Sequence, residues 1–168
     1  MNEPASRPSS KFRRIVTKHD EKGQSTIWFD DDASNHKFPS EKISSTLMWS
    51  TETTPTDIFG TTDEGERILG SSPPLGGSRF TMMEFQPGNE ANLHRTDTID
   101  YVICIEGEID MFFDEKQFIT MKLGDVLIQR GTNHAWANRS NKPCRLAVVL
   151  LDALPKRIGS ISGLVSAR

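Results

Sequence analysis

The second half of the chain consists of short apolar or alternating runs that are interrupted at regular intervals. Runs of this length with a period of two are typical of β-strands, and the helical period of 3.6 residues is almost absent. Gly, Asn and Asp residues at the breaks supply the reversals that such strands need. The pattern predicts an all-β sandwich or barrel. The runs are RFTMMEF, IDYVICIEGEIDMFF, QFITMKL, DVLIQ, HAWAN and CRLAVVLLDA.

The first half contributes fewer strands. Residues 13–17 and 25–29 are rich in β-branched and aromatic residues and are separated by KHDEKGQ, which predicts a hairpin. The stretch from residue 30 to 42 is polar, and the alternation of residues 43–51 predicts one more strand. Clustered Gly, Ser and Pro make residues 60–78 a long loop, with one helical turn at most within EGERIL.

The length of 168 residues suits one domain that buries its own core. Both ends of the chain lack a regular apolar pattern, so we expect them to be tails. The predicted organisation is a tail over residues 1–10, strands and a loop packed on the barrel over 11–78, the barrel core over 79–152, and a C-terminal tail over 153–168.

Composition excludes several partners. A formal net charge of −3 gives no signal for nucleic acid, and no apolar run approaches the ~20 residues that cross a bilayer. The N-terminus lacks the apolar stretch of a secretory signal, so we expect a soluble, cytoplasmic protein. Cys104 and Cys144 lie within apolar runs and have no CxxC spacing, which predicts buried structural thiols.

Two segments carry candidate chemistry. His94 and Asp100 are separated by an even number of residues, so on one strand they face the same side. His134 and Asn138 are also an even step apart, with Trp136 between them. Two imidazoles and one carboxylate that converge in a barrel form a ligand set for non-haem iron, and they also suit Zn, Mn or Ni. Without a metal, the same groups form an acid–base pocket.

At these residues the chain resembles the cupin superfamily. The first cupin motif is matched in spacing by Gly88, His94, Asp100 and Gly107. The resemblance implies a cupin-type double-stranded β-helix, a jelly-roll barrel, over residues 79–152. It also implies extra N-terminal strands and a small organic molecule in the barrel mouth.

The second cupin motif begins with Gly124 and Asp125 and leads through a strand to Gly131, His134 and Asn138. The strand before the turn is one residue shorter than is usual in the family. This motif supplies the second imidazole of the expected site.

The chain departs from the family pattern at three positions. Thr96 stands where the first motif has its second His, Asp100 replaces Glu, and Gln129 replaces the proline of the second motif. The resemblance implies one divalent metal (Fe, Zn, Mn or Ni) on His94, Asp100 and His134. Because Thr96 stands in place of a His, one strong neutral ligand of the family is missing from this set. The same three residues are the predicted catalytic groups with or without the metal.

Four further residues are expected to bind the substrate. Thr96 and Asn138 belong to the two motifs, and Trp136 lies two residues from His134. Trp49, in the predicted strand of residues 43–51, is the fourth.

The fold alone does not decide the function, because cupin barrels include isomerases, decarboxylases, dioxygenases, lyases and non-enzymatic binders. Stand-alone cupins of this kind resemble accessory enzymes of secondary metabolism. They imply a lyase or isomerase that carries out dehydration, cyclisation, aromatisation or decarboxylation on a carbonyl or polyketide-like metabolite. One alternative is a metal-dependent dioxygenase with a two-His one-carboxylate site, and another is a metabolite-binding module without catalysis.

The N-terminal strands predict self-association. They carry more apolar surface than one small barrel needs, and unpaired strands are a liability in solution. We therefore expect a homodimer with a two-fold interface.

Overall fold

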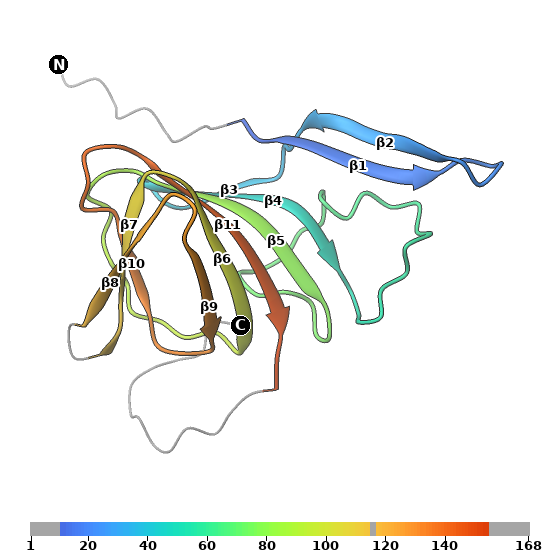
Figure 1. Cartoon of the computed structure of the whole chain (residues 1–168). Helices are drawn as coiled ribbons and strands as arrows, with labels where there is room; N and C mark the ends of the chain where they lie inside the picture. Colours follow the sequence, from blue (N-terminus) through green and yellow to red (C-terminus); the bar gives the residue numbers. More distant parts are fainter. Residues whose placement is uncertain (1–10, 115–116, 155–168) are drawn as a thin grey trace.

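The computed structural model describes residues 11–114 and 117–154, and this part of the chain is built from strands without an α-helix (Figure 1). The all-β prediction is confirmed. No helix in the described residues is long and apolar enough to span a membrane. The strands are β1 (Arg13–His19), β2 (Ser25–Asp32), β3 (His36–Ser40), β4 (Ile43–Thr51), β5 (Ser78–Phe85), β6 (Thr98–Glu106), β7 (Glu108–Phe112), β8 (Phe118–Lys122), β9 (Val126–Arg130), β10 (Ala135–Ala137) and β11 (Cys144–Asp152).

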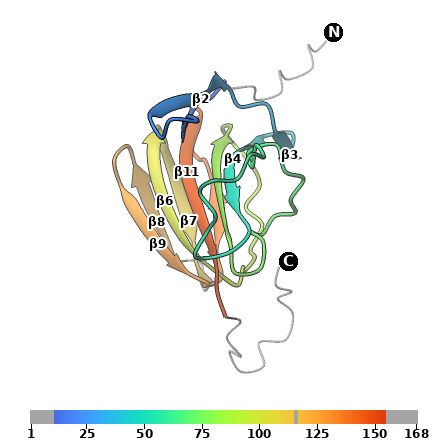
Figure 2. The ribbon, with the colours of Figure 1, turned by 90° about the vertical axis from the view of Figure 1, so that its right-hand side faces the viewer.

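Two antiparallel sheets face each other across the core (Figure 2). The larger sheet has the order β3-β4-β5-β11-β6-β9, and the smaller has the order β10-β7-β8. The last strand, β11, lies between β5 and β6 and pairs with both, so it joins these two strands into one sheet. The core between the sheets is formed by Phe85, Val102, Cys104, Ile109, Met121, Cys144, Leu146 and Val148.

Cys104 and Cys144 belong to this core, and both are free and buried. Their sulfur atoms lie 3.9 Å apart, and burial raises the pKa of both thiols. The expectation of buried structural thiols is confirmed.

The strand register places four residues in one row across the larger sheet. Leu150 of β11 is opposite Arg79 of β5 on one side and Asp100 of β6 on the other. Asp100 is in turn opposite Gln129 of β9. Residues directly opposite each other in antiparallel strands point to the same face, and Val148, two residues from Leu150, lies in the core. The row therefore lies on the inner face of the sheet.

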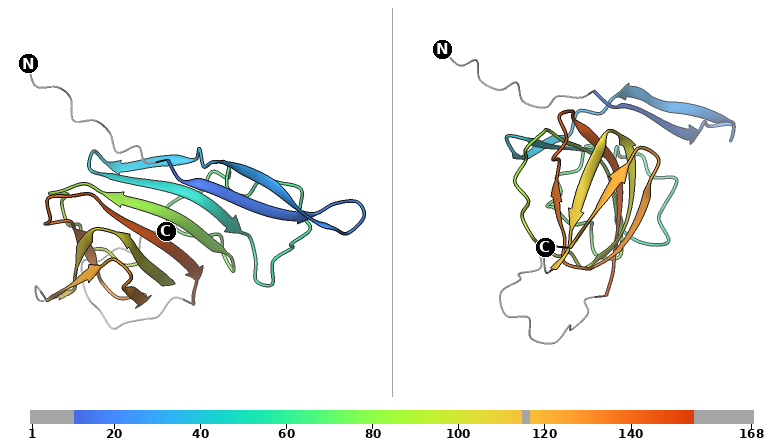
Figure 3. Two further views of the ribbon diagram at one scale, coloured as in Figure 1. Left: turned by 45° about the horizontal axis from the view of Figure 1, so that its top comes forward. Right: turned by 60° about the vertical axis from the view of Figure 1, so that its left-hand side comes forward.

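The hairpin predicted from residues 13–17 and 25–29 is present as β1 and β2, and it packs on the outer face of the sheet beside β4 (Figure 3). Arg14 is held between Asp31 at 2.9 Å and Asp63 at 2.8 Å, which ties the hairpin to the loop after β4. The apolar contact beneath it comprises Phe12, Ala33, Met48, Phe80, Met82 and Ala147.

Two local features differ from the sequence prediction. The polar stretch of residues 30–42 contains an edge strand, β3, which pairs with β4. The loop of residues 60–78 is confirmed as irregular, but EGERIL contains a turn instead of a helical turn, with Glu66 N donating to Asp63 O at 3.2 Å. The predicted tails lie outside the described residues, apart from residues 153 and 154.

The homodimer remains a prediction. Beyond the hairpin, the outer face of β6 and β9 exposes Tyr101, Ile103 and Ile128. Light scattering at micromolar concentration should give the mass of two chains, and a monomeric mass would contradict the proposal. Deletion of residues 1–10 should preserve the dimer. Deletion of residues 1–30 should give an aggregating or unfolded product, because it removes β1 and most of β2 and uncovers the apolar contact on the outer face.

Candidate functional site

A cavity of about 570 Å³ lies on the inner face of the larger sheet. Five of the predicted site residues line it together. Most of the remaining wall is apolar, with Phe85, Val102, Leu146 and Val148 at its base. The lining residues predicted from sequence are His94, Thr96, Asp100, His134 and Trp136.

The two histidines are joined through their backbones. His94 N donates to His134 O, and His134 N donates to His94 O, each at 2.9 Å. The two imidazole ring centroids lie 4.3 Å apart. Since these bonds involve only the backbone, side-chain substitution at either position leaves the bridge possible.

Gln129 fixes the orientation of the His134 ring. Its side-chain amide nitrogen donates to Thr132 O at 2.9 Å, and Gly131 N donates to its Oε1 at 3.3 Å, so the amide orientation satisfies both neighbours. The same amide nitrogen lies 2.7 Å from His134 Nδ1. Thr132 O lies 3.0 Å from the same Nδ1, but this carbonyl already accepts from the Gln129 amide. A side-chain amide nitrogen only donates, so the shorter Gln129 contact makes Nδ1 the acceptor and places the proton of neutral His134 on Nε2.

His94 adopts the opposite tautomer. Its Nδ1 lies 2.9 Å from Asn92 O, and a carbonyl oxygen only accepts, so Nδ1 carries the proton. The Nε2 atom of neutral His94 is then a proton acceptor, whereas that of His134 is a donor. The paired rings therefore offer one base and one acid to the same cavity.

Asp100 is buried at the centre of the site. Its Oδ1 accepts from Thr98 Oγ1 at 2.5 Å, and Thr98 Oγ1 also lies 2.8 Å from Thr96 Oγ1. A hydroxyl has one proton, so Thr96 donates to Thr98 while Thr98 donates to the carboxylate. Burial raises the pKa of Asp100 to about 6, against smaller opposing effects of Thr98 and His94. The carboxyl group thus titrates near neutral pH.

His134 is shifted in the direction that keeps it neutral. Burial lowers its pKa to about 4, and the nearby His94 acts in the same direction, whereas the Thr132 carbonyl opposes the shift. At neutral pH this imidazole is uncharged and donates through Nε2.

Thr96 and Trp136 lie where the sequence predicts, in the cavity wall. The Trp136 ring centroid is 6.1 Å from that of His134 and 6.4 Å from that of Phe85. Their contact with a substrate remains a prediction.

Asn138 is placed elsewhere. It is fully buried, and its side chain is committed to loop contacts: Nδ2 donates to Phe85 O and to Lys142 O, both at 2.8 Å, and Oδ1 accepts from Ser140. With its polar atoms used in this way, it holds the two motifs together and does not line the cavity. The structure therefore does not bring Asn138 together with the other predicted substrate-binding residues of the two motifs.

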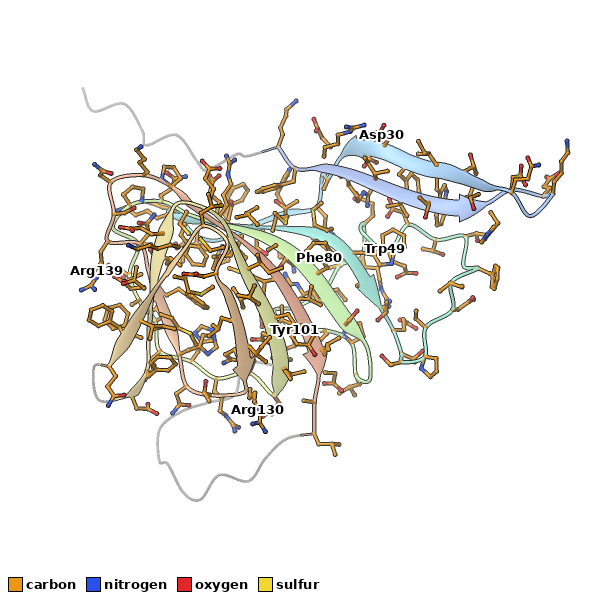
Figure 4. All side chains as sticks on the ribbon, in the orientation of Figure 1. Asp30, Trp49, Phe80, Tyr101, Arg130 and Arg139 are labelled. Carbon is orange, nitrogen blue, oxygen red and sulfur yellow. The ribbon has the colours of Figure 1, made fainter. Side chains whose placement is uncertain are left out.

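Trp49 is also outside the cavity. A β-bulge between Leu47 and Trp49 shifts the register, so that Leu47 faces inward opposite Thr81 while Trp49 lies opposite Phe80. Trp49 and Phe80 lie between the sheet and the hairpin (Figure 4), in the wall of a separate open cavity of about 1320 Å³. The Trp49 ring contacts the Trp28 ring in a T-shaped arrangement, with ring centroids 6.3 Å apart. The structure therefore does not bring Trp49 together with the predicted catalytic residues.

Three polar residues of the site were missed. Thr98 has the same parity as His94, Thr96 and Asp100, so alternation could have identified it. Gln129 stands at a motif position, where the loss of proline was noted without a role. Arg79 lines the same cavity, and no motif points to it.

The side chains do not fit a metal centre of the kind that the resemblance implies. The described residues contain no group of three or more His, Cys, Asp or Glu side chains arranged to hold a metal ion. The Gln129 amide also directs the His134 proton onto Nε2, whereas a ligating imidazole nitrogen must be deprotonated. The arrangement is suited to acid–base chemistry.

The tautomers give a spectroscopic prediction. At pH 7.5, imidazole ¹⁵N shifts should identify His134 as the Nε2–H form and His94 as the Nδ1–H form. In Gln129→Leu, which has no amide, His134 Nδ1 should become protonated and donate to Thr132 O. Detection of the same His134 tautomer in both proteins would contradict control by Gln129.

Comparison with known proteins agrees with the fold and the motifs. The cupin domain family matches residues 81–150. A phomopsin biosynthesis cluster protein of Diaporthe leptostromiformis is 34% identical over 166 residues, covering 90% of this chain and 86% of the relative. A cupin-domain-containing oxidoreductase of Neurospora crassa is 35% identical, covering 86% of this chain and 79% of the relative. Another, of Aspergillus ruber, is 35% identical, covering 85% and 73%. The chain belongs to the cupin family, as its two motifs predict.

Proposed function

We propose that the protein is an enzyme that moves a proton next to a carbonyl group of a small metabolite, acting as an isomerase or lyase. The observation that carries this proposal is the pair of adjacent imidazoles in opposite tautomers, with ring centroids 4.3 Å apart, beside a carboxyl group with a pKa of about 6. Such matched acid and base groups are what proton transfer at neutral pH requires. The relatives from biosynthesis clusters support a metabolite of secondary metabolism as the substrate.

The proposed reaction begins with proton abstraction. The Asp100 carboxylate removes a proton from the carbon beside the carbonyl, and the electron pair of the C–H bond forms an enolate. Nε2–H of His134 donates to the developing oxyanion, inside a cavity with mostly apolar walls. His94 Nε2 accepts a hydrogen bond from the substrate and orients it.

Two outcomes follow from the enolate. Return of the proton from Asp100 to another carbon gives an isomer. Departure of a β-hydroxyl group that takes the proton from Asp100 gives water and an unsaturated carbonyl compound. Both outcomes balance without a redox partner.

The test uses phenylpyruvate, which has an acidic CH₂ group beside a ketone. In D₂O the protein should exchange these protons faster than buffer alone, as measured by ¹H NMR. An exchange rate equal to that of buffer for phenylpyruvate and for the neutral ketone benzyl methyl ketone would contradict the proposal.

The names of the relatives favour one alternative, an oxidoreductase. That function needs a redox partner, and the resemblance to the cupins implies a redox-active divalent metal such as Fe, Mn or Ni for this role. Elemental analysis of protein purified without added metal decides between the two. Stoichiometric iron, together with oxygen consumption on turnover, would support the oxidoreductase and count against proton transfer alone.

A further inference from the structure

Arg79 is a buried cation in the wall of the catalytic cavity. It lies on β5, is only 6% exposed, and lines the same cavity as His94, Asp100 and His134. One terminal nitrogen, Nη1, donates to Gly70 O, and Nη2 lies at the long distance of 3.5 Å from Ser45 Oγ. Its Nε has no hydrogen-bond partner among the described residues.

The Nε and Nη2 atoms form the edge of a guanidinium that binds a carboxylate with two parallel hydrogen bonds. Two other arginines of this chain use that edge. Arg13 binds Asp30 through Nε and Nη2 at 2.7 and 2.8 Å, and Arg14 binds Asp31 at 3.0 and 2.9 Å. In Arg79 the same edge has one long contact and one unpartnered N–H.

No carboxylate in the described part of the chain balances this charge. Within the described residues, no Asp or Glu lies at ion-pair distance from Arg79. Burial alone lowers the pKa of its guanidinium, with no acidic group acting in the opposite direction. A buried cation without a counter-ion is costly to the folded state, so its retention calls for a compensating role.

The position of Arg79 relative to the reacting groups is fixed by the sheet. Arg79 and Asp100 flank Leu150 on adjacent strands, which places their backbones about 10 Å apart at the usual strand spacing. Lys37 lines the same cavity, and its Nζ donates to Leu69 O. Lys37 and Arg79 therefore both contact the loop of residues 60–78 where it meets the cavity.

We propose that the substrate carries a carboxylate, which Arg79 binds while the carbonyl group lies against Asp100 and His134. This inference rests on the proposed function for the reacting end and names the chemistry of the other end. The substrate class is then a carboxylic acid with an apolar body and a ketone or enol.

Binding of phenylacetate and of phenylacetamide tests the inference without turnover. The two probes have the same shape, and only phenylacetate is charged. In NMR titrations the wild-type protein should bind phenylacetate about tenfold or more tightly than the amide, because charge-assisted hydrogen bonds are the stronger ones. Amide signals of β5 and β11 should shift on addition of phenylacetate.

The variant Arg79→Met should bind the two probes about equally, and Arg79→Lys should keep part of the preference because it keeps the charge. Arg130→Met is the matched control. Arg130 is exposed on β9 (Figure 4), so this substitution removes the same charge at a position outside the cavity. Equal affinity of wild type for both probes would overturn the inference, and so would a preference that survives in Arg79→Met. A failure of Arg79→Met to fold leaves the wild-type comparison and Arg79→Lys decisive.

The outcomes separate the two proposals. Probe binding needs no chemistry, so loss of the carboxylate preference counts against the Arg79 inference alone. Absence of proton exchange in phenylpyruvate and benzyl methyl ketone, with the preference for phenylacetate intact, counts against the proposed function alone.

Discussion

Asp100→Asn should lower the rate of proton exchange in phenylpyruvate by about two orders of magnitude or more, which is the usual contribution of a positioned general base. Asparagine keeps the shape and still accepts from Thr98 Oγ1, but it has no basic oxygen. In the wild type the exchange rate should rise with pH through about 6, as Asp100 loses its proton. The variant should lack this pH dependence.

His94→Ala and His134→Ala should each lose activity to a similar degree, with unchanged β-type circular dichroism. Because the three groups act as one unit, a double variant should lose little more than a single one. Asp97→Asn is the matched control: it changes an acid three residues away that pairs with Arg95 and does not line the cavity. Full activity in folded Asp100→Asn protein would remove Asp100 from the mechanism.

The second large effect concerns stability. The pKa of Asp100 is raised from 3.8 to about 6 in the folded protein, so the folded state binds the proton more tightly than the unfolded state. Its contribution to stability is then fully present below about pH 4 and is lost as the pH rises through about 6. At pH 7.5, Asp100→Asn should therefore raise the free energy of unfolding, by up to about 3 kcal/mol for a shift of this size.

His134 has the opposite dependence. Its pKa is lowered from 6.5 to about 4, so its contribution is present above pH 6.5 and is lost as the pH falls through about 4. Between about pH 4 and pH 6.5, the opposite contributions of Asp100 and His134 to the pH dependence of stability offset each other in the wild type. In Asp100→Asn the His134 contribution is no longer offset, so the free energy of unfolding should fall on acidification.

Urea unfolding of the wild type and Asp100→Asn at intervals from pH 4 to pH 8 measures both effects. The difference between the two curves isolates Asp100, because the other titrating groups are shared. A difference that stays flat across this range would mean that burial does not perturb the Asp100 carboxyl group.

Alternation and motif spacing were sufficient to place His94, Thr96, Asp100, His134 and Trp136 around one cavity. In extended strands an even separation keeps side chains on one face, and the glycines of the two motifs fix the turns between strands. These rules depend only on local geometry. The strands of the second half and the N-terminal hairpin follow from the same rules.

Alternation failed where a strand departs from regular geometry. The bulge at Met48 moved Trp49 to the outer face, and no sequence signal announces a bulge in ISSTLMWST. Arg79 was missed for another reason. Strand β5 is apolar on both faces, because Phe80 and Met82 are covered by the hairpin while Met83 and Phe85 face the core. The sequence therefore does not reveal which face holds the arginine.

Leu150 separates the two charged residues of the inner row, and its side chain faces the same cavity. The distance between a substrate's acid group and its reacting carbon is thus set by the width of two strand spacings, which the hydrogen bonds of the sheet hold constant. The spacing of the strands therefore fixes the length of substrate that fits between Arg79 and Asp100. Changes in the loops can alter which molecules enter the cavity. The length of a molecule that reaches both charged residues is set by the sheet, and loop changes leave it unaltered.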